Sequence, residues 1–188
     1  VELITNSNDS YNRLEAEGRA TSGRIVVEIC RRRKGYEIKV TDFAEGMDGE
    51  VLDRALVYGE DASGFSSGAP VRGYFGRGLK DAILGLGDGE ITSFKNGQMH
   101  RARLVIRDGR PWYEAEKPQP VLHESNQTTI HITISRKGIR MPHFDNLRTK
   151  LSLYYSLRDI LSNPKRSLLL RLTDAKSRLK NEVRLVYK

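Results

Sequence analysis

The 188-residue sequence has little cysteine, few aromatic residues and no long apolar run. Its single cysteine, Cys30, excludes a disulfide framework and any zinc site built from cysteines. The histidines lack the spacing of a metal-binding pair on a helix; they are His100, His123, His131 and His143. No apolar run approaches the roughly 18 residues of a membrane span, and no signal-type segment opens the sequence. We therefore expect a cytoplasmic protein, or a nuclear one in a eukaryote, without membrane contact.

Enough apolar material is present for a folded core. Hydrophobic residues make up 38% of the sequence and charged residues 30%, which excludes a disordered chain. The net charge of +8 is unevenly distributed, because residues 1–100 carry 13 basic and 16 acidic side chains while residues 136–188 carry 14 and 4. A basic surface attracts phosphate backbones, so DNA is a candidate partner of the C-terminal region. Solvated helix and strand faces are the alternative interpretation.

Apolar periodicity and turn residues predict the order of the secondary structure. The predicted helices are 2–17, 47–58, 79–86 and 144–161, and the predicted strands are 24–33, 36–42, 89–95, 98–107, 112–116, 128–135, 167–172 and 183–187. A glycine- and serine-rich stretch at 59–78 is long enough to be a functional lid or a disordered loop. This order predicts an α+β sandwich with helices on one face of a mixed, mainly antiparallel sheet.

Polar residues recur on one face of the first predicted helix. Glu2, Asn6 and Asp9 are separated by steps of four and three, which return to the same side of a helix. Two carboxylates and a carboxamide suit Mg²⁺, which takes one or two protein oxygens beside water and phosphate. A solvated polar helix face is the alternative.

A second polar element, Thr41–Met47, follows a predicted strand and precedes a helix. Asp42 at the strand end can accept a hydrogen bond from the amino group of a base, and Gly46 permits a close backbone approach. An ordinary strand-to-helix turn would have the same composition.

Two weaker elements follow. In the glycine-rich run 73–80, backbone N–H groups and a helix N-terminus favour phosphate binding, although a flexible loop has similar glycines. The run is neither a Walker loop nor a dinucleotide fingerprint. Thr128 opens a strand with alternating isoleucines, and threonine is common in strands for packing reasons alone.

In this order and spacing, the four elements resemble the ATP-binding domain of the GHKL superfamily, which includes DNA gyrase, Hsp-ninety chaperones, histidine kinases and MutL. Residues 2–10 resemble its asparagine box, 42–47 its first glycine box, 73–80 its lid-end glycine box and 128–130 its threonine strand. The resemblance covers residues 1–135 and implies the two-layer GHKL (Bergerat) sandwich.

A finer resemblance is to MORC-like ATPases. Tyr74–Lys80 (YFGRGLK) is similar to their Y-G-N-G-L-K lid end, and 85–87 and 92–94 match a glycine and strand pattern downstream. Ser156–Pro164 is similar to the segment that leads into their ribosomal-protein-like transducer subdomain. The resemblance implies an ATP-binding domain at 1–140 and the start of that subdomain at 141–188. It also implies a homodimer that closes on ATP binding and engages DNA.

The resemblance implies a role for each matching residue. Glu2 would be the general base that polarises the attacking water, Asn6 would ligate Mg²⁺, and Asp42 would bind the adenine amino group of ATP or ADP. Because histidine kinases usually lack a carboxylate at the position of Glu2, the resemblance favours slow ATP hydrolysis over kinase action. The remaining nucleotide-binding residues that it implies are Asp9, Gly46, Met47, Gly73, Gly76, Gly78, Leu79, Lys80 and Thr128.

The chain departs from the family pattern at Ala44, which stands where the first glycine box has a glycine. Positive φ at this position would strain the turn by roughly 1 kcal/mol or more, whereas negative φ would not. The start at Val1, directly before the proposed base, leads us to expect that part of a helix and an N-terminal arm precede it. Two further functions therefore remain open: a non-hydrolysing ATP-responsive binding module, and a chaperone-like GHKL ATPase that acts on protein clients.

Overall fold

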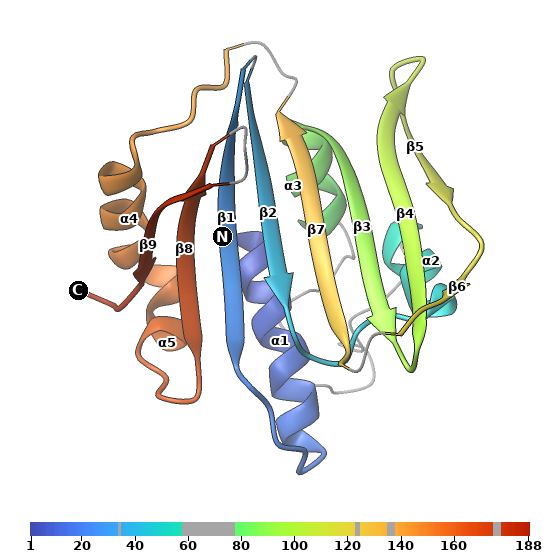
Figure 1. The fold of residues 1–188 in the computed structure, drawn as a ribbon, viewed down its shortest axis with the longest axis horizontal. Helices are drawn as coiled ribbons and strands as arrows, with labels where there is room; N and C mark the ends of the chain where they lie inside the picture. Colours follow the sequence, from blue (N-terminus) through green and yellow to red (C-terminus); the bar gives the residue numbers. More distant parts are fainter. Residues whose placement is uncertain (34, 58–77, 123–124, 135–137, 175–177) are drawn as a thin grey trace.

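We describe a computed structural model of the chain over residues 1–33, 35–57, 78–122, 125–134, 138–174 and 178–188 (Figure 1). Five α-helices, one short 3₁₀ turn and nine strands make up this part and form an α+β fold with one mixed open sheet. Within these ranges, no helix combines the length and apolarity needed to cross a membrane. The helices are α1 (Glu2–Ala16), α2 (Gly49–Leu56), α3 (Gly78–Leu86), α4 (Phe144–Ser152) and α5 (Arg158–Leu161), and the 3₁₀ turn is Tyr155–Leu157.

The sheet has the strand order β5-β4-β3-β7-β2-β1-β8-β9, and the short β6 pairs with β4. All neighbours are antiparallel except β1 and β8, which run parallel. The strands are β1 (Arg24–Arg32), β2 (Gly35–Asp42), β3 (Gly87–Lys95), β4 (Gln98–Arg107), β5 (Arg110–Ala115), β6 (Gln119–Pro120), β7 (Gln127–Ile134), β8 (Ser167–Thr173) and β9 (Leu179–Arg184).

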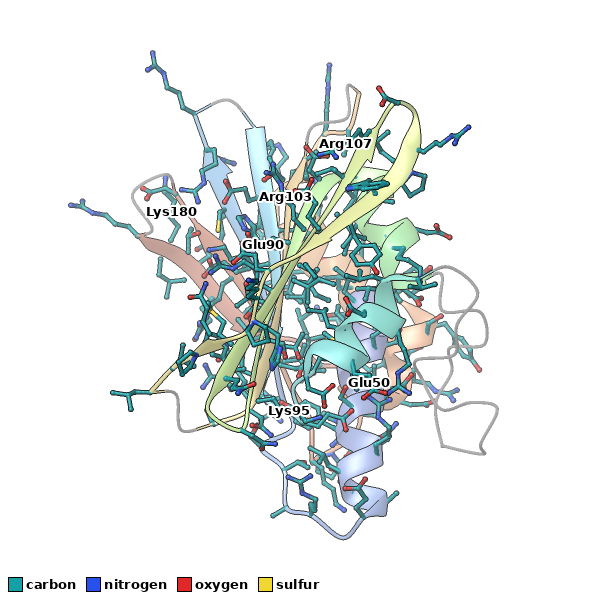
Figure 2. All side chains as sticks on the ribbon, turned by 90° about the vertical axis from the view of Figure 1, so that its right-hand side faces the viewer. Glu50, Glu90, Lys95, Arg103, Arg107 and Lys180 are labelled. Atoms are coloured by element: carbon teal, nitrogen blue, oxygen red, sulfur yellow. The ribbon has the colours of Figure 1, made fainter. Side chains whose placement is uncertain are left out.

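The helices cover one face of the sheet, as the two perpendicular views show (Figures 1 and 2). Strand residues alternate between this face and the opposite one, so every second apolar residue enters the core. On β1 these are Ile25, Val27 and Ile29, which are 0%, 7% and 3% exposed. The opposite face carries cross-strand ion pairs, among them Arg107–Glu114. The predicted α+β class with a mixed sheet is confirmed, while the GHKL sandwich stays a prediction.

The C-terminal segment joins the same sheet through the parallel pair β1–β8. Ile25 lies opposite Leu168, and Val27 lies opposite Leu170. The side chains of Leu168 and Leu170 are 2% and 0% exposed, so part of the segment 141–188 shares its core with the first part of the chain. The division into domains at 140/141 stays a prediction.

The predicted single helix over 144–161 is wrong. After α4, Tyr154 adopts an extended backbone with φ −76° and ψ 113°, and the chain continues as the 3₁₀ turn and α5. In one continuous helix, Leu157 would lie on a different side from the core-facing Leu151, since six residues turn a helix by about 600°. The break allows Leu157 and Ile160 to enter the core, where they are 0% and 2% exposed.

Most other boundaries lie within two residues of the prediction, the short β6 was not predicted, and two differences have a clear physical reason. The last strand is Leu179–Arg184 rather than 183–187, because β9 pairs with β8 along a polar, exposed stretch that has no apolar alternation. Helix α2 begins at Gly49 rather than 47, because the carboxylate of Asp48 accepts a hydrogen bond from Val51 N and caps the helix. The predicted lid at 59–78 lies outside the described residues except for Gly78.

Candidate functional site

Helix α1 carries the first predicted elements of the site along one flank. Glu2 is exposed, Asn6 is half-buried and Asp9 is 6% exposed. The helix packs on the sheet through an adjacent apolar stripe formed by Leu3, Ile4, Tyr11 and Leu14. The amphipathic pattern of the sequence therefore determines which flank of α1 borders the core and fixes the direction of the polar residues.

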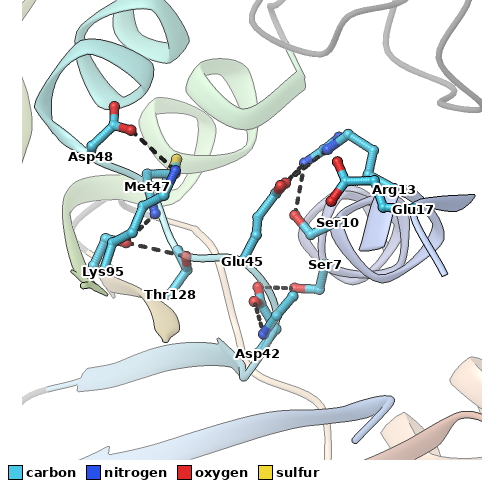
Figure 3. Close-up of polar contacts among 12 residues, drawn as sticks. Ser7, Ser10, Arg13, Glu17, Asp42, Glu45, Met47, Asp48, Lys95 and Thr128 are labelled. Carbon is cyan, nitrogen blue, oxygen red and sulfur yellow. Dashed lines mark hydrogen bonds and ion pairs between the residues drawn. The ribbon is translucent and has the colours of Figure 1, made fainter. Parts of the chain in front are cut away.

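Asp42 is the last residue of β2 and lies beneath α1. Its side chain accepts hydrogen bonds from Ser7 Oγ at 2.9 Å and from Ala44 N at 3.2 Å (Figure 3). Burial raises the pKa of this carboxyl from 3.8 to about 6, against the lowering effect of these two hydrogen bonds. A buried carboxylate with such a pKa is costly for folding, which is typical of groups kept for binding or catalysis.

A row of polar residues crosses the helix-covered face of the sheet from Asp42. Thr128 on β7 is its register partner, and Ser93 on β3 is the partner of Thr128. Thr128 is 8% exposed and Ser93 is fully buried, with 3.5 Å between their hydroxyl oxygens. Ser93 Oγ also donates to Gln127 O at 3.2 Å and accepts from Met47 N at 2.6 Å. The structure thus places Asp42, Thr128 and Met47 close to one another.

The turn after Asp42 is fastened to α1 by two further contacts. Tyr11 Oη accepts a hydrogen bond from Phe43 N at 2.9 Å. Arg13 pairs with the carboxylate of Glu45 through Nε at 2.8 Å and through Nη2 (Figure 3). Contacts on both sides hold the turn in one conformation, which is the preorganisation that a binding site needs.

Gly46 is required by the geometry of this turn. Its φ is +65°, and a Cβ at this position would lie 2.3 Å from Phe94 O. Ala44, in contrast, does not have a positive φ; among the described residues other than glycine, only Asn96 and Asp108 do. Alanine therefore introduces no backbone strain at this position of the turn.

The beginning of α3 meets the beginning of α1. A Cβ on Gly78 would lie 1.8 Å from Glu2 Oε1, so the carboxylate of Glu2 occupies the space that a side chain at 78 would fill. Glu2 and Gly78, which come from two separate predicted elements, therefore lie next to each other, while their roles as base and phosphate-binding glycine stay predictions. Leu79 is half-buried against the core, and the predicted site residues Gly73 and Gly76 lie outside the described residues.

Lys80 points away from solvent. Its side chain is 1% exposed, and its Nζ donates to Ala55 O and Val57 O, both at 2.9 Å. These carbonyls belong to the C-terminal end of α2, where an ammonium group satisfies acceptors that the helix leaves open. Contact between Lys80 and a phosphate would require the side chain to leave both carbonyls.

Two cavities adjoin the helix layer. One of about 520 Å³ lies between α2, α3 and the β4–β5 hairpin and includes Lys80, and one of about 470 Å³ lies between α1, α3 and α4 and includes Glu2. Asp42 lines neither of these two cavities, and the candidate site is defined here by the polar contacts of the described residues. In the described ranges, no group of three or more His, Cys, Asp or Glu side chains could hold a metal ion.

Several residues of the site were missed by the sequence analysis. Ser7 interrupts the apolar stripe of α1, and a polar residue at such a position must find a buried partner, which is a signal that points to Asp42. Ser93 has no comparable signal, because polar residues in strands are common and its partners come from two other segments.

Comparison with models of known protein families finds no match to this chain. Comparison with curated proteins finds no relative.

Proposed function

We propose that the chain is a Mg²⁺-dependent ATP-binding and ATP-hydrolysing domain of the GHKL type, with MORC-like ATPases as its nearest resemblance. The observation that carries the proposal is the convergence of three separated segments. Ser7 on α1 bonds to Asp42 at the end of β2, and Glu2 on α1 fills the space beside Gly78 at the start of α3. The resemblance assigns the general base to the first of these segments, adenine recognition to the second and phosphate recognition to the third.

The adenine end of the proposed site is built from Asp42 and Thr128. A carboxylate accepts the amino group of adenine but repels the carbonyl that guanine has in its place, so Asp42 favours adenine. Thr128 faces the same end of the sheet and adds a hydroxyl that can donate or accept. Gly46 and Met47 belong to the same turn, and the absence of a side chain at 46 lets this turn lie directly against Phe94 O at the end of β3.

The phosphate end of the proposed site is formed by α1 and the first turn of α3. Glu2 is exposed and its carboxylate adjoins Gly78, a position from which it can accept a proton from water. The backbone N–H groups of the first turn of α3 favour phosphate oxygens. Mg²⁺ held by Asn6 would neutralise charge on the phosphates, as in other phosphoryl-transfer sites.

The backbone at Ala44 supports a functional glycine box. The non-hydrolysing alternative drew its support from strain at this position, and the turn has no positive φ there. Hydrolysis is therefore favoured over a passive binding module.

Substitution of Glu2, the proposed general base, tests the proposed function. We expect slow Mg²⁺-dependent release of phosphate from ATP by the wild type and no release by Glu2→Ala, with binding of an ATP analogue retained. The matched control is Glu17→Ala, which removes an exposed carboxylate just after the same helix. Turnover by wild type equal to a no-enzyme control, or full activity in Glu2→Ala, would contradict the proposal.

The proposed output is a homodimer that closes on ATP binding and engages DNA through 141–188. The excess of 14 basic over 4 acidic residues in 136–188 supports this part. We expect duplex DNA binding whose affinity falls steeply between 50 and 200 mM salt, as it does when several phosphates are contacted. Salt-insensitive or undetectable DNA binding, together with ATPase stimulation by an unfolded protein, would favour the chaperone-like alternative.

A further inference from the structure

Arg166 is a buried arginine that joins the C-terminal segment to α1. It directly precedes β8, and its side chain is fully buried. A buried charge is costly unless hydrogen bonds and an opposite charge compensate for it. The partners that compensate the charge of this guanidinium therefore indicate the structural role of Arg166.

All five N–H donors of Arg166 have acceptors, and three of the acceptor residues lie on α1. Nε donates to Asn8 Oδ1 at 2.7 Å, and Nη2 donates to Asn12 Oδ1 at 2.8 Å. Glu15 accepts in a bidentate manner, from Nη1 at 2.6 Å and from Nη2 at 3.1 Å. Lys165 O accepts the fifth bond at 3.5 Å. Only a planar guanidinium can satisfy this arrangement, because lysine has three donors and no fork.

A second route leads from Arg166 to the turn that follows Asp42. The guanidinium carbon lies 5.2 Å from the centre of the Tyr11 ring, within the range of a cation–π contact. Tyr11 Oη donates to Arg24 O at 2.6 Å and accepts from Phe43 N at 2.9 Å. Arg166 of the C-terminal segment thus contacts Tyr11, the residue of α1 that binds the turn after Asp42.

The acceptors of Arg166 form a stripe on α1 that is separate from the proposed catalytic stripe. Asn8, Asn12 and Glu15 follow one another at steps of four and three, as Glu2, Asn6 and Asp9 do. At 3.6 residues per turn, the two stripes lie about a third of a turn apart around the helix. Rotation of α1 about its axis would break the hydrogen bonds from Arg166 to Asn8, Asn12 and Glu15. It would also turn the side chains of Glu2, Asn6 and Asp9 away from the proposed nucleotide site by the same angle.

We propose that Arg166 is a positioning residue that sets the rotation of α1 and thereby couples the C-terminal segment to the nucleotide site. The inference rests on the proposed function for its activity readout. Stability alone does not account for the residue, because an apolar side chain of similar volume often serves a core equally well. The particular contribution of the guanidinium is orientation.

Amide hydrogen exchange on the whole chain tests the coupling without any nucleotide. Arg166→Met and Arg166→Lys should speed exchange in residues 6–14 and at Phe43 by about tenfold or more, while β3 and β7 keep wild-type protection. The control is Arg171→Met on β8, which removes an arginine–carboxylate pair with Glu182 on the opposite face of the sheet. If Arg166→Met does not fold, Glu15→Gln is the second variant, because it removes only the charge opposite Arg166. It should speed amide exchange in the same residues, but by a smaller factor.

Binding of a non-hydrolysable ATP analogue supplies the second readout. In the Arg166 variants, analogue affinity should fall about ten- to hundredfold, as for other residues that orient ligand-binding groups, and Arg171→Met should bind as wild type does. Uniform acceleration of exchange across the sheet, or unchanged protection of α1, would overturn the proposal. Unchanged analogue affinity in a wild type that binds the analogue would overturn it as well. A wild type that binds no analogue would contradict the proposed function instead, and the exchange pattern would still decide the role of Arg166.

Discussion

Ser7 Oγ on α1 donates a 2.9 Å hydrogen bond to Asp42 Oδ2, although the two residues are 35 positions apart in the chain. Both are almost fully buried, at 3% and 6% exposure. The bond joins the helix that carries the proposed base and metal ligand to the strand end that carries the proposed adenine ligand. The other carboxylate oxygen, Oδ1, accepts only the longer bond from Ala44 N at 3.2 Å. Oδ1 is therefore better able than Oδ2 to accept a hydrogen bond from the amino group of adenine.

Loss of the Ser7 hydroxyl should raise the pKa of Asp42 above about 6, because the bond from Ser7 favours the charged form. Ser7→Ala should also cost about 1 kcal/mol of stability at neutral pH. The pKa can be followed by carboxyl ¹³C NMR in a pH titration. Ser7→Thr, which keeps a hydroxyl, is the control, and an unchanged titration in Ser7→Ala would refute the assigned bond.

The stability of the protein should depend on the charge of Asp42 in an unusual direction. Because its folded pKa lies above the unfolded value, the folded state holds the proton more tightly, and stability falls as pH rises from about 4 to 6. Asp42→Asn carries no charge, so it should be more stable than wild type at pH 7 by about 1–3 kcal/mol while losing ATP-analogue binding. Urea unfolding at several pH values measures the difference.

Asp48 supplies the matched control for this pH effect. The bond from Val51 N, helped by Lys95, lowers the pKa of Asp48, so its contribution is present at neutral pH and is lost as pH falls through its folded pKa. Asp48→Asn should therefore lower stability at pH 7, the reverse of Asp42→Asn. A destabilised Asp42→Asn would show that burial of this carboxylate is not costly.

Gly46→Ala should destabilise the protein by about 2 kcal/mol or more, because it combines a positive φ with a close contact to Phe94 O. Gly85→Ala is the matched control on α3, where nothing lies within 4 Å of an added Cβ. That substitution should stabilise the helix by up to about 1 kcal/mol. Chemical denaturation of both variants distinguishes the two sites, and equal effects would contradict the described turn.

Gly78→Ala should lower ATP turnover without a comparable loss of stability. The three atoms nearest to an added Cβ all belong to the exposed side chain of Glu2, which can move aside, but in doing so the proposed general base leaves its place. We expect turnover to fall by about ten- to hundredfold with unfolding near that of wild type. A large stability loss with normal activity per folded molecule would argue against the position of Glu2.

Sequence patterns predicted the elements that local periodicity determines. The first helix, the β1–β2 hairpin and the strands β3, β4 and β7 lie within two residues of their predicted bounds, because apolar residues alternate or recur along them. The break between α4 and α5 was missed because Leu157 and Ile160 face a core that only the folded sheet supplies. The parallel pairing of β1 with β8 depends on segments more than a hundred residues apart and has no local signature.

In the candidate site, too, features that depend on a local pattern were predicted, and features that depend on distant segments were not. The placement of Glu2 and Asp42 on a helix and at a strand end was predicted, since each lies in a short pattern. The direction of Lys80 toward Ala55 O and Val57 O was not, because it depends on where α2 ends beside α3. Arg166 was missed because its partners on α1 lie 151 or more positions earlier in the chain.

A crystal structure of the chain with Mg²⁺ and a non-hydrolysable ATP analogue tests the central claim most directly. The account predicts the adenine amino group within hydrogen-bond distance of the Asp42 carboxylate, with Asn6 and the first turn of α3 at the phosphates. Adenine bound elsewhere, with Asp42 still bonded only to Ser7 and Ala44, would contradict the assignment of the site and of the function.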